Sequence, residues 1–183
     1  PRPRAESPVL TSPREVRMTR LISRRVVLAL GVLAALGGAI IEAQRSSSSA
    51  AMATAAERFL ASLTPEQRQQ ATFAFDSPER LRWHFVPQFE RNGLQIKAMT
   101  EPQRKLAHEL LRTGLSDRGY TTYTQIMQLE NILKAQEKGG GPIRDAEGYR
   151  FSVFGTPSAK GTWGWRVEFH HVSLRFDVVN GTA

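Results

Sequence analysis

Residues Phe151 to Val179 read FSVFGTPSAKGTWGWRVEFHHVSLRFDVV, and this stretch contains a histidine pair at a break in its apolar pattern. Apolar side chains occupy odd positions before the pair and even positions after it, namely Trp165, Val167 and Phe169, then Val172, Leu174, Phe176 and Val178. Because side chains alternate between the two faces of a strand, the break requires an inserted residue or a change of buried face.

A bulge at the histidine pair is our first interpretation of the break. Two residues of a bulged strand oppose one residue of its partner, and bulges are enriched next to active sites. The bulge would leave the polar side chains together on one face, opposite the apolar ones. We therefore predict a catalytic site made of Arg166, Glu168, His170 and His171. The alternative is a sheet buried on different faces at its two ends, with each histidine merely hydrogen-bonded.

The same residues predict a divalent metal cofactor. Two imidazoles and the carboxylate of Glu168 make a ligand set suited to Zn or Fe(II). His170 and His171 are the predicted metal ligands or acid–base groups, and Arg166 would hold an anionic substrate group. His84 is an outside candidate for a third ligand or a substrate contact. A partly buried, hydrogen-bonded histidine is the alternative at that position.

A second hypothesis is a binding module without catalysis. Trp163 and Trp165 flank a glycine that allows close backbone approach, so they could form a stacking platform for the ring of a sugar or peptide. Core packing by two large aromatic side chains is the alternative. The partner in either hypothesis is an unidentified small-molecule, peptide or sugar ligand.

Composition excludes several classes of protein. The 183 residues carry a formal net charge of +8, but residues 1–43 contain seven of the 25 basic residues and three of the 17 acidic ones. The rest of the chain is therefore only weakly basic and has no basic cluster, so we expect no nucleic-acid partner. The absence of Cys excludes disulfides, a thiolate metal site and a cysteine nucleophile.

The N-terminal region predicts export. Residues 1–17 are a Pro- and Arg-rich leader that cannot form a core. Residues 18–43 have a basic start, an apolar run and a small-residue end, as in a signal peptide or an N-terminal anchor. Arg24-Arg25 fits a twin-arginine signal, with ordinary Sec export as the alternative. Residues 44–50 are a Ser-rich linker. We expect a periplasmic or extracellular protein that meets the membrane only through this N-terminal segment.

The remaining chain, residues 51–183, predicts an α+β fold in which N-terminal helices pack on a mostly antiparallel sheet. Cap-and-proline signatures begin helices at Thr64 and Thr100, and further helices are expected over residues 51–63 and 120–138. Strands are expected over residues 81–86 and 149–154, and from Trp163 onward. Asn180-Gly181 is a strong hairpin signal near the end of the chain, so we expect a domain truncated at its C-terminus.

Several motifs in one order resemble the DUF3500 family of exported bacterial and fungal proteins. They are FLASLTPEQR at 59–68, WHFVP at 83–87, GL at 93–94, MT at 99–100, QR at 103–104, HELL at 108–111, FGTP at 154–157, WGWR at 163–166 and HHVSL at 170–174. The resemblance covers residues 51–179 and implies a longer domain whose C-terminal half is absent here. It implies no particular activity. Arg175 departs from the family pattern, where a smaller polar residue is expected.

Overall fold

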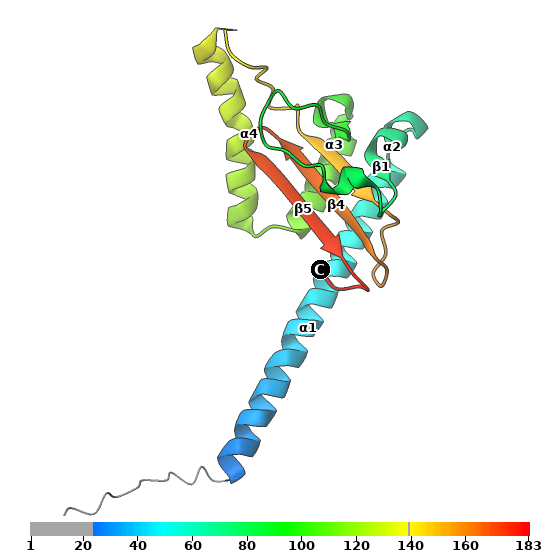
Figure 1. Cartoon of the computed structure of the whole chain (residues 1–183), viewed down its shortest axis with the longest axis vertical. Coiled ribbons are helices and arrows are strands. Elements are labelled where there is room, and N and C mark those ends of the chain that lie inside the picture. The colour runs from blue at the N-terminus through cyan, green and yellow to red at the C-terminus, as the bar shows by residue number, and fades with distance from the viewer. Residues whose placement is uncertain (1–23, 139) are drawn as a thin grey trace, which may run out of the picture. The chain divides into compact units, whose positions relative to one another are not determined.

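The structure is a computed structural model that describes residues 24–138 and 140–183 (Figure 1). The chain divides into two compact units, residues 1–38 and 39–183. The first is described only as the beginning of helix α1, Arg24–Ala61. The predicted leader and the first residues of the predicted signal peptide lie outside the described residues. Within the described part of the chain, no helix is long and apolar enough to cross a membrane.

Residues 44–50, which we predicted as a linker, are helical and lie within α1. Serine has a helix propensity only modestly below that of the alanines that follow it. The hydroxyl of Ser48 also donates to the backbone oxygen of Gln44 at 3.1 Å, so its hydrogen bond is satisfied inside the helix. From Met52 onward α1 buries an apolar face, and the side chain of Phe59 is fully buried.

Two later helices, α2 (Pro65–Ala71) and α3 (Glu101–Thr113), begin at the capping residues that the sequence predicts, whereas α4 (Asp117–Glu137) begins three residues before the predicted range 120–138. The hydroxyl of Thr64 accepts from the Gln67 N–H at 3.2 Å, and Gln67 Oε1 accepts from the Thr64 N–H at 3.0 Å. This is a reciprocal capping box, and Thr100 and Gln103 form the same arrangement on α3. Ser116 caps α4.

A five-stranded sheet forms the other layer of the second unit: β1 (Thr72–Phe73), β2 (Leu94–Gln95), β3 (Arg150–Phe154), β4 (Trp163–Phe169) and β5 (Val172–Val178). The strand order is β1-β3-β4-β5, and β2 also pairs with β3. β1 runs parallel to β3, and the other pairs are antiparallel. The predicted α+β class and the mostly antiparallel sheet are therefore confirmed.

The break at the histidine pair is a chain reversal, and the predicted bulge is wrong. Phe169 of β4 pairs with Val172 of β5, so His170 and His171 form a two-residue turn between antiparallel strands. Each odd-numbered residue of β4 therefore faces an even-numbered residue of β5, which accounts for the change of phase. His171 has φ of 60°, in the left-handed region where histidine is more common than most residues.

The strand predicted over residues 81–86 is also wrong. A short 3-10 helix, η1 (Pro78–Leu81), begins the segment and irregular backbone follows it. Trp83 and Phe85 alternate with His84 as in a strand, but the backbone groups of His84 and Phe85 pair with side chains and with the histidine turn instead of a neighbouring strand. We call residues 74–93 the covering segment.

Different parts of the chain cover the two faces of the sheet. Its apolar face packs on α1, α3 and α4, where Phe59, Leu110, Leu111, Tyr123, Trp165 and Val167 belong to one buried cluster. The covering segment crosses the opposite, polar face, in front of the sheet in Figure 1. After β5, Asn180 and Gly181 have φ of 51° and 76° and Val179 pairs with Thr182, so the predicted hairpin turn is present.

Candidate functional site

Arg166 and Glu168 project from β4 onto the polar face beneath the covering segment. Arg166 Nη2 lies 2.9 Å from Glu168 Oε1 and 2.6 Å from Oε1 of Glu79. Arg166 Nη1 also donates to the backbone oxygen of Glu79 at 2.7 Å. The side chains of Arg166 and Glu168 are 0% and 1% exposed. The structure brings these two predicted residues together, but in a buried ion-pair network.

This network ties the covering segment to the sheet. Glu168 Oε2 accepts from the His84 N–H at 2.9 Å, and Arg91 Nε lies 4.0 Å from the same oxygen. Burial raises the pKa of Glu168, although the His84 N–H and the arginines act in the opposite direction. Arg91 donates to the backbone oxygens of His84 at 3.1 Å, of Phe89 at 2.8 Å and of Val86. Its guanidinium therefore donates hydrogen bonds to three backbone oxygens of the covering segment.

The His84 side chain packs and hydrogen-bonds within the covering segment. Its ring stacks on Phe89 with the centroids 4.4 Å apart. Its Nδ1 accepts from the N–H groups of Phe85 at 3.1 Å and Val86 at 3.3 Å. The covering segment reaches the histidine turn through its backbone, because the His171 N–H donates to the Phe85 oxygen at 2.9 Å. His84 is thus the partly buried, hydrogen-bonded histidine of our alternative interpretation.

His170 faces α4 and not the polar face of β4. Its ring is buried, and its Nδ1 lies 2.5 Å from Glu130 Oε1 and 2.9 Å from Arg144 Nη1. A neutral imidazole either donates to the carboxylate from that nitrogen or accepts from the guanidinium there. The Tyr149 hydroxyl donates to the His170 backbone oxygen at 2.8 Å. His171 is exposed, and its ring centroid lies 3.8 Å from that of His170.

The predicted metal ligands do not converge. The oxygens of Glu168 face Arg166 and the covering segment, whereas the ring of His170 faces Glu130 on α4. Among residues 24–138 and 140–183, no group of three or more His, Asp or Glu side chains is placed to hold a metal ion. The turn separates the two parts of the expected set, because it directs the histidines away from the face that carries Glu168.

Trp163 and Trp165 are fully buried, so they do not form an exposed stacking platform. Both occupy odd positions of β4, which face the helices. Trp165 stacks on Phe176 of β5 with the centroids 4.4 Å apart. Trp163 Nε1 donates to the backbone oxygen of Ser158 at 3.0 Å. The structure supports the core-packing alternative for both side chains.

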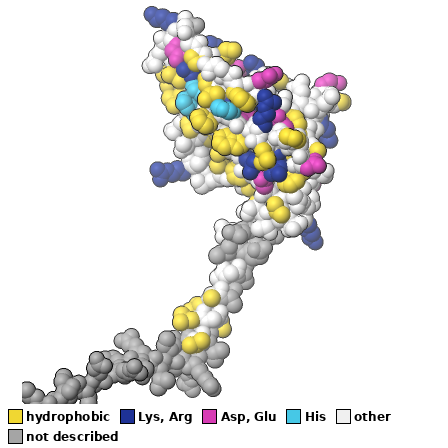
Figure 2. All heavy atoms as spheres, viewed as in Figure 1, with side chains coloured by type: hydrophobic (Ala, Val, Ile, Leu, Met, Phe, Trp, Pro, Cys, Tyr) yellow, Lys and Arg dark blue, Asp and Glu magenta, His cyan; other side chains and the backbone are white. Residues whose placement is uncertain are grey.

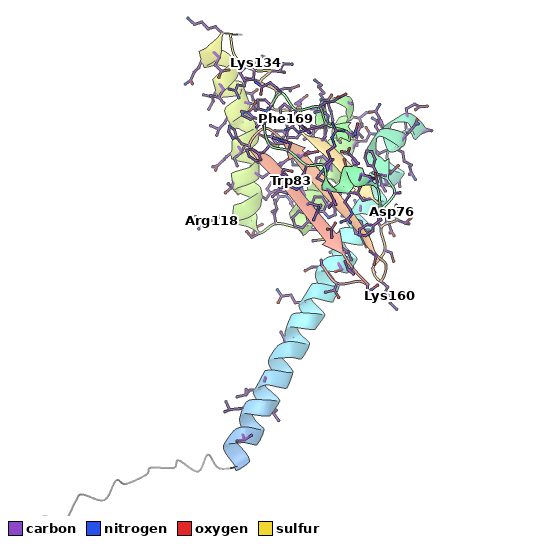
Figure 3. All side chains as sticks on the ribbon, viewed as in Figure 1. Asp76, Trp83, Arg118, Lys134, Lys160 and Phe169 are labelled. Carbon is purple, nitrogen blue, oxygen red and sulfur yellow. The ribbon has the colours of Figure 1, made fainter. Side chains whose placement is uncertain are left out.

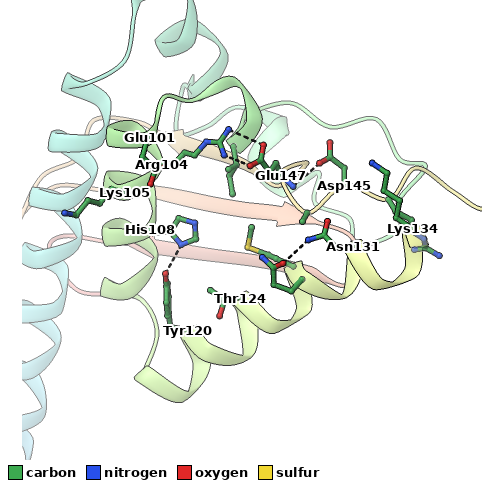
Figure 4. A pocket seen from close by; sticks show the side chains of 15 residues that line it. Glu101, Arg104, Lys105, His108, Tyr120, Thr124, Asn131, Lys134, Asp145 and Glu147 are labelled. Atoms are coloured by element: carbon green, nitrogen blue, oxygen red, sulfur yellow. Dashed lines mark hydrogen bonds and ion pairs between the residues drawn. The ribbon is translucent and has the colours of Figure 1, made fainter. Parts of the chain in front are cut away.

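A polar cleft of 610 Å³ lies between α3, α4 and residues 144–147 (Figure 4). Its lining carries four cationic side chains, Arg104, Lys105, Lys134 and Arg144, and three carboxylates, Glu101, Asp145 and Glu147. Two of the carboxylates are engaged in ion pairs, Glu147 with Arg104 and Asp145 with Lys97. Arg104 and Arg144 are held in ion pairs as well, so the lining carries one more cationic than anionic side chain.

His108 and Tyr120 form a hydrogen-bonded pair on the wall of this cleft. His108 Nδ1 lies 2.9 Å from the Tyr120 hydroxyl oxygen, as Figure 4 shows. Burial lowers the pKa of His108, and the charge of Arg112 lowers it further. The Arg112 guanidinium also lies over the Tyr120 ring, 3.6 Å from its centroid. The pair thus combines a neutral imidazole, a phenol and a nearby cation.

The position of His108 in a cleft wall was not predicted from the sequence, where this residue reads as a helix-surface or helix–sheet contact. The residues between α3 and α4 reverse the chain and place the start of α4 opposite the middle of α3. Two residues that are twelve positions apart then meet. A polar side chain on each helix is too weak a signal to predict such a pair.

Arg144 connects the cleft to His170. It lines the cleft, and its guanidinium lies 2.7 Å from Glu137 Oε1 as well as 2.9 Å from His170 Nδ1. The hydrogen bond from Arg144 lowers the pKa of Glu137. The predicted catalytic residue His170 therefore lies behind the cleft, in contact with one of its lining side chains.

The lowered pKa of His108 predicts a pH-dependent stability. Below pH 6.5, the ordinary pKa of histidine, the unfolded chain binds a proton at this position more readily than the folded chain does. The stability due to neutral His108 is therefore complete above that pH and is lost as the pH falls toward the lower folded pKa. We expect His108→Gln to reduce the loss of unfolding free energy between pH 7.5 and pH 5, measured by urea denaturation. An unchanged difference would contradict the expectation.

Comparison with known proteins supplies the family of the chain. Residues 45–183 match the family model DUF3500, described as a protein of unknown function. The chain therefore belongs to the DUF3500 family, and the matched range includes the residues 51–179 on which the resemblance rested. No curated protein and no solved structure matches the chain.

Proposed function

We propose that this DUF3500 protein binds a small anionic ligand in the cleft between α3 and α4 and moves a proton there through His108 and Tyr120. The observation that carries the proposal is the hydrogen bond between His108 Nδ1 and the Tyr120 hydroxyl in the cleft wall, where burial lowers the pKa of His108. An imidazole kept neutral near pH 7 can accept a proton. The proposal keeps the histidine-based enzyme chemistry expected from the sequence and moves it from the β4–β5 turn to this cleft.

The hydrogen bond between the two side chains can serve as a proton relay. When the Tyr120 oxygen takes a proton from a bound ligand, the Tyr120 hydroxyl passes its own proton to His108 Nδ1, so the ligand loses one proton and the imidazole gains one. Tyr120 would touch the ligand, and His108 would receive the proton.

The charge of the lining supports an anionic ligand. Arg104 and Arg144 are each held by a carboxylate, Glu147 and Glu137 respectively. Lys105 and Lys134 are exposed at the cleft and extend from α3 and α4. Figure 4 places Lys105 and Lys134 at opposite ends of the cleft, so a carboxylate or phosphate bound at either end would face one ammonium group.

Inorganic phosphate and acetate are suitable probes for this proposal. We expect either anion to shift the NMR signals of the His108 imidazole and to raise the melting temperature of the full-length chain. The double variant Lys105→Gln/Lys134→Gln should weaken both responses several-fold. Lys160→Gln is the matched control, since Figure 3 shows Lys160 and Lys134 at opposite ends of the folded unit. An equal response of the double variant and the control would contradict anion binding in the cleft.

The role of the pair has its own test. Tyr120→Phe removes the hydroxyl but keeps a ring beneath Arg112, so the fold should persist while the His108 pKa changes. The measurement is the imidazole titration by NMR. A His108 titration identical to that of the unmodified protein would show that the hydrogen bond does not couple the two groups.

A further inference from the structure

A second pocket, of 330 Å³, lies between α2, the end of the covering segment, and strands β2 and β3. Its lining carries two guanidinium groups and four side-chain amides, which belong to Arg91, Arg150, Gln69, Gln70, Asn92 and Gln95. Within the part of the chain that the structure describes, no carboxylate lines it. The pocket therefore differs from the cleft between α3 and α4, where carboxylates balance most of the cations.

The polar layer beneath the covering segment carries more positive than negative charge. Figure 2 shows basic and acidic side chains among hydrophobic ones on the face that this segment crosses. Glu79 and Glu168 both pair with Arg166, at 2.6 and 2.9 Å. Glu168 also lies 4.0 Å from Arg91 and opposite Arg150 in the β3–β4 ladder. Three guanidinium groups thus share two carboxylates, and one positive charge is left over beside the pocket.

Arg150 carries this excess charge. Its half-buried guanidinium donates to the Gly148 backbone oxygen at 3.2 Å and, with the side-chain oxygen of Gln95 turned toward it, to that oxygen at 2.8 Å. Both acceptors are neutral. Asp145 also acts on the charge of Arg150, but this carboxylate is paired with Lys97 at 3.0 Å. A partly buried cation without a counter-ion of its own is stabilised when an anion binds beside it.

Gly93 brings the covering segment against β3 at this pocket. Its φ of 110° lies in the region that glycine adopts without steric cost. A Cβ at this position would come within 2.6 Å of Ser152 Oγ and 3.0 Å of the Phe151 backbone oxygen. The Ser152 hydroxyl is buried and has no hydrogen-bond partner among the described residues. This end of the polar layer therefore leaves one of its own polar groups unsatisfied.

We propose that this pocket binds a small hydroxylated carboxylate, with the carboxylate on the Arg150 guanidinium and the hydroxyl groups on the amides of α2. One excess positive charge matches a monovalent anion, and the planar fork of a guanidinium matches a carboxylate. Gln69 and Gln70 are exposed on α2, and their amides can donate to or accept from hydroxyl groups. The pocket shares no lining residue with the cleft between α3 and α4.

Glucuronate is a suitable probe, and glucose is its uncharged counterpart. We expect glucuronate to shift the backbone N–H signals of Asn92 and Gly93 saturably in an NMR titration of the full-length chain, whereas glucose should not. Arg150→Gln removes the charged donor, so it should weaken glucuronate binding roughly tenfold or more. The proposal is overturned if glucuronate leaves both signals in place, if glucose shifts them equally, or if Arg150→Gln binds glucuronate as the unmodified chain does.

A second variant tests the pocket without touching the buried network. Gln70→Glu adds a negative charge at an exposed lining position of α2 and should weaken glucuronate binding several-fold. Gln125→Glu is the matched control, since it adds the same charge to α4, which Figure 1 shows on the other side of the folded unit. Equal affinity of these two variants would place the ligand elsewhere. The double variant Lys105→Gln/Lys134→Gln should keep the response at Gly93, so this proposal and anion binding in the α3–α4 cleft can fail independently.

Discussion

Replacing Glu168 by alanine is expected to lower the free energy of unfolding by about 3–5 kcal/mol, because it leaves buried cations without their partner. Arg166 is fully buried and would keep only Glu79, and Arg91 would lose the charge that offsets its own burial. The His84 N–H would also lose its acceptor. Urea denaturation monitored by circular dichroism measures the change.

Two control variants make this expectation specific. Glu168→Gln keeps an oxygen for the His84 N–H and removes only the charge, so its effect should lie between those of the unmodified chain and the alanine variant. Glu109→Ala removes one partner of an exposed ion pair with Arg58, and such pairs contribute about 0–1 kcal/mol. If the Glu168 and Glu109 variants lost the same stability, the buried network would not hold the covering segment to the sheet.

The parts of the fold that the sequence predicted depend on short-range signals. Thr64 and Thr100 begin helices because the cap, the proline and the returning glutamine all lie within four residues. The alternation around the histidine pair correctly assigned Trp165 to one face of the sheet and Arg166 to the other. A two-residue turn and a bulge both shift the phase by one residue, and His170-His171 lacks the Asn-Gly or Asp-Gly that marks a hairpin turn.

The parts that were missed depend on contacts between distant residues. The side chains of Glu168 and Arg91 bind backbone groups of the covering segment that a neighbouring strand would otherwise bind. The alternating aromatic residues of the segment therefore predicted a strand, although the segment pairs with none. The cleft pair requires α3 and α4 to lie antiparallel at one particular register. We predicted a site at His170 and His171 because they are adjacent polar residues at the break in the pattern. These two residues form the turn between β4 and β5, so their rings do not lie on the face of β4.

Replacing Trp165 by alanine is expected to lower the free energy of unfolding by about 3–5 kcal/mol, the usual cost of a large cavity in a core. The indole is fully buried and stacks on Phe176 between the sheet and the helices. Gly114 lies against the same two rings, and a Cβ added there would come within 2.7 Å of the Phe176 ring, so both rings pack tightly against the end of α3. Thermal and urea denaturation measure the loss.

Trp83→Ala is the matched control, since it removes the same side chain from a position that is 48% exposed. Its effect on the free energy of unfolding should stay within about 0.5 kcal/mol, as for most surface substitutions. Equal destabilisation by the two tryptophan variants would contradict the division between a core indole and a surface indole.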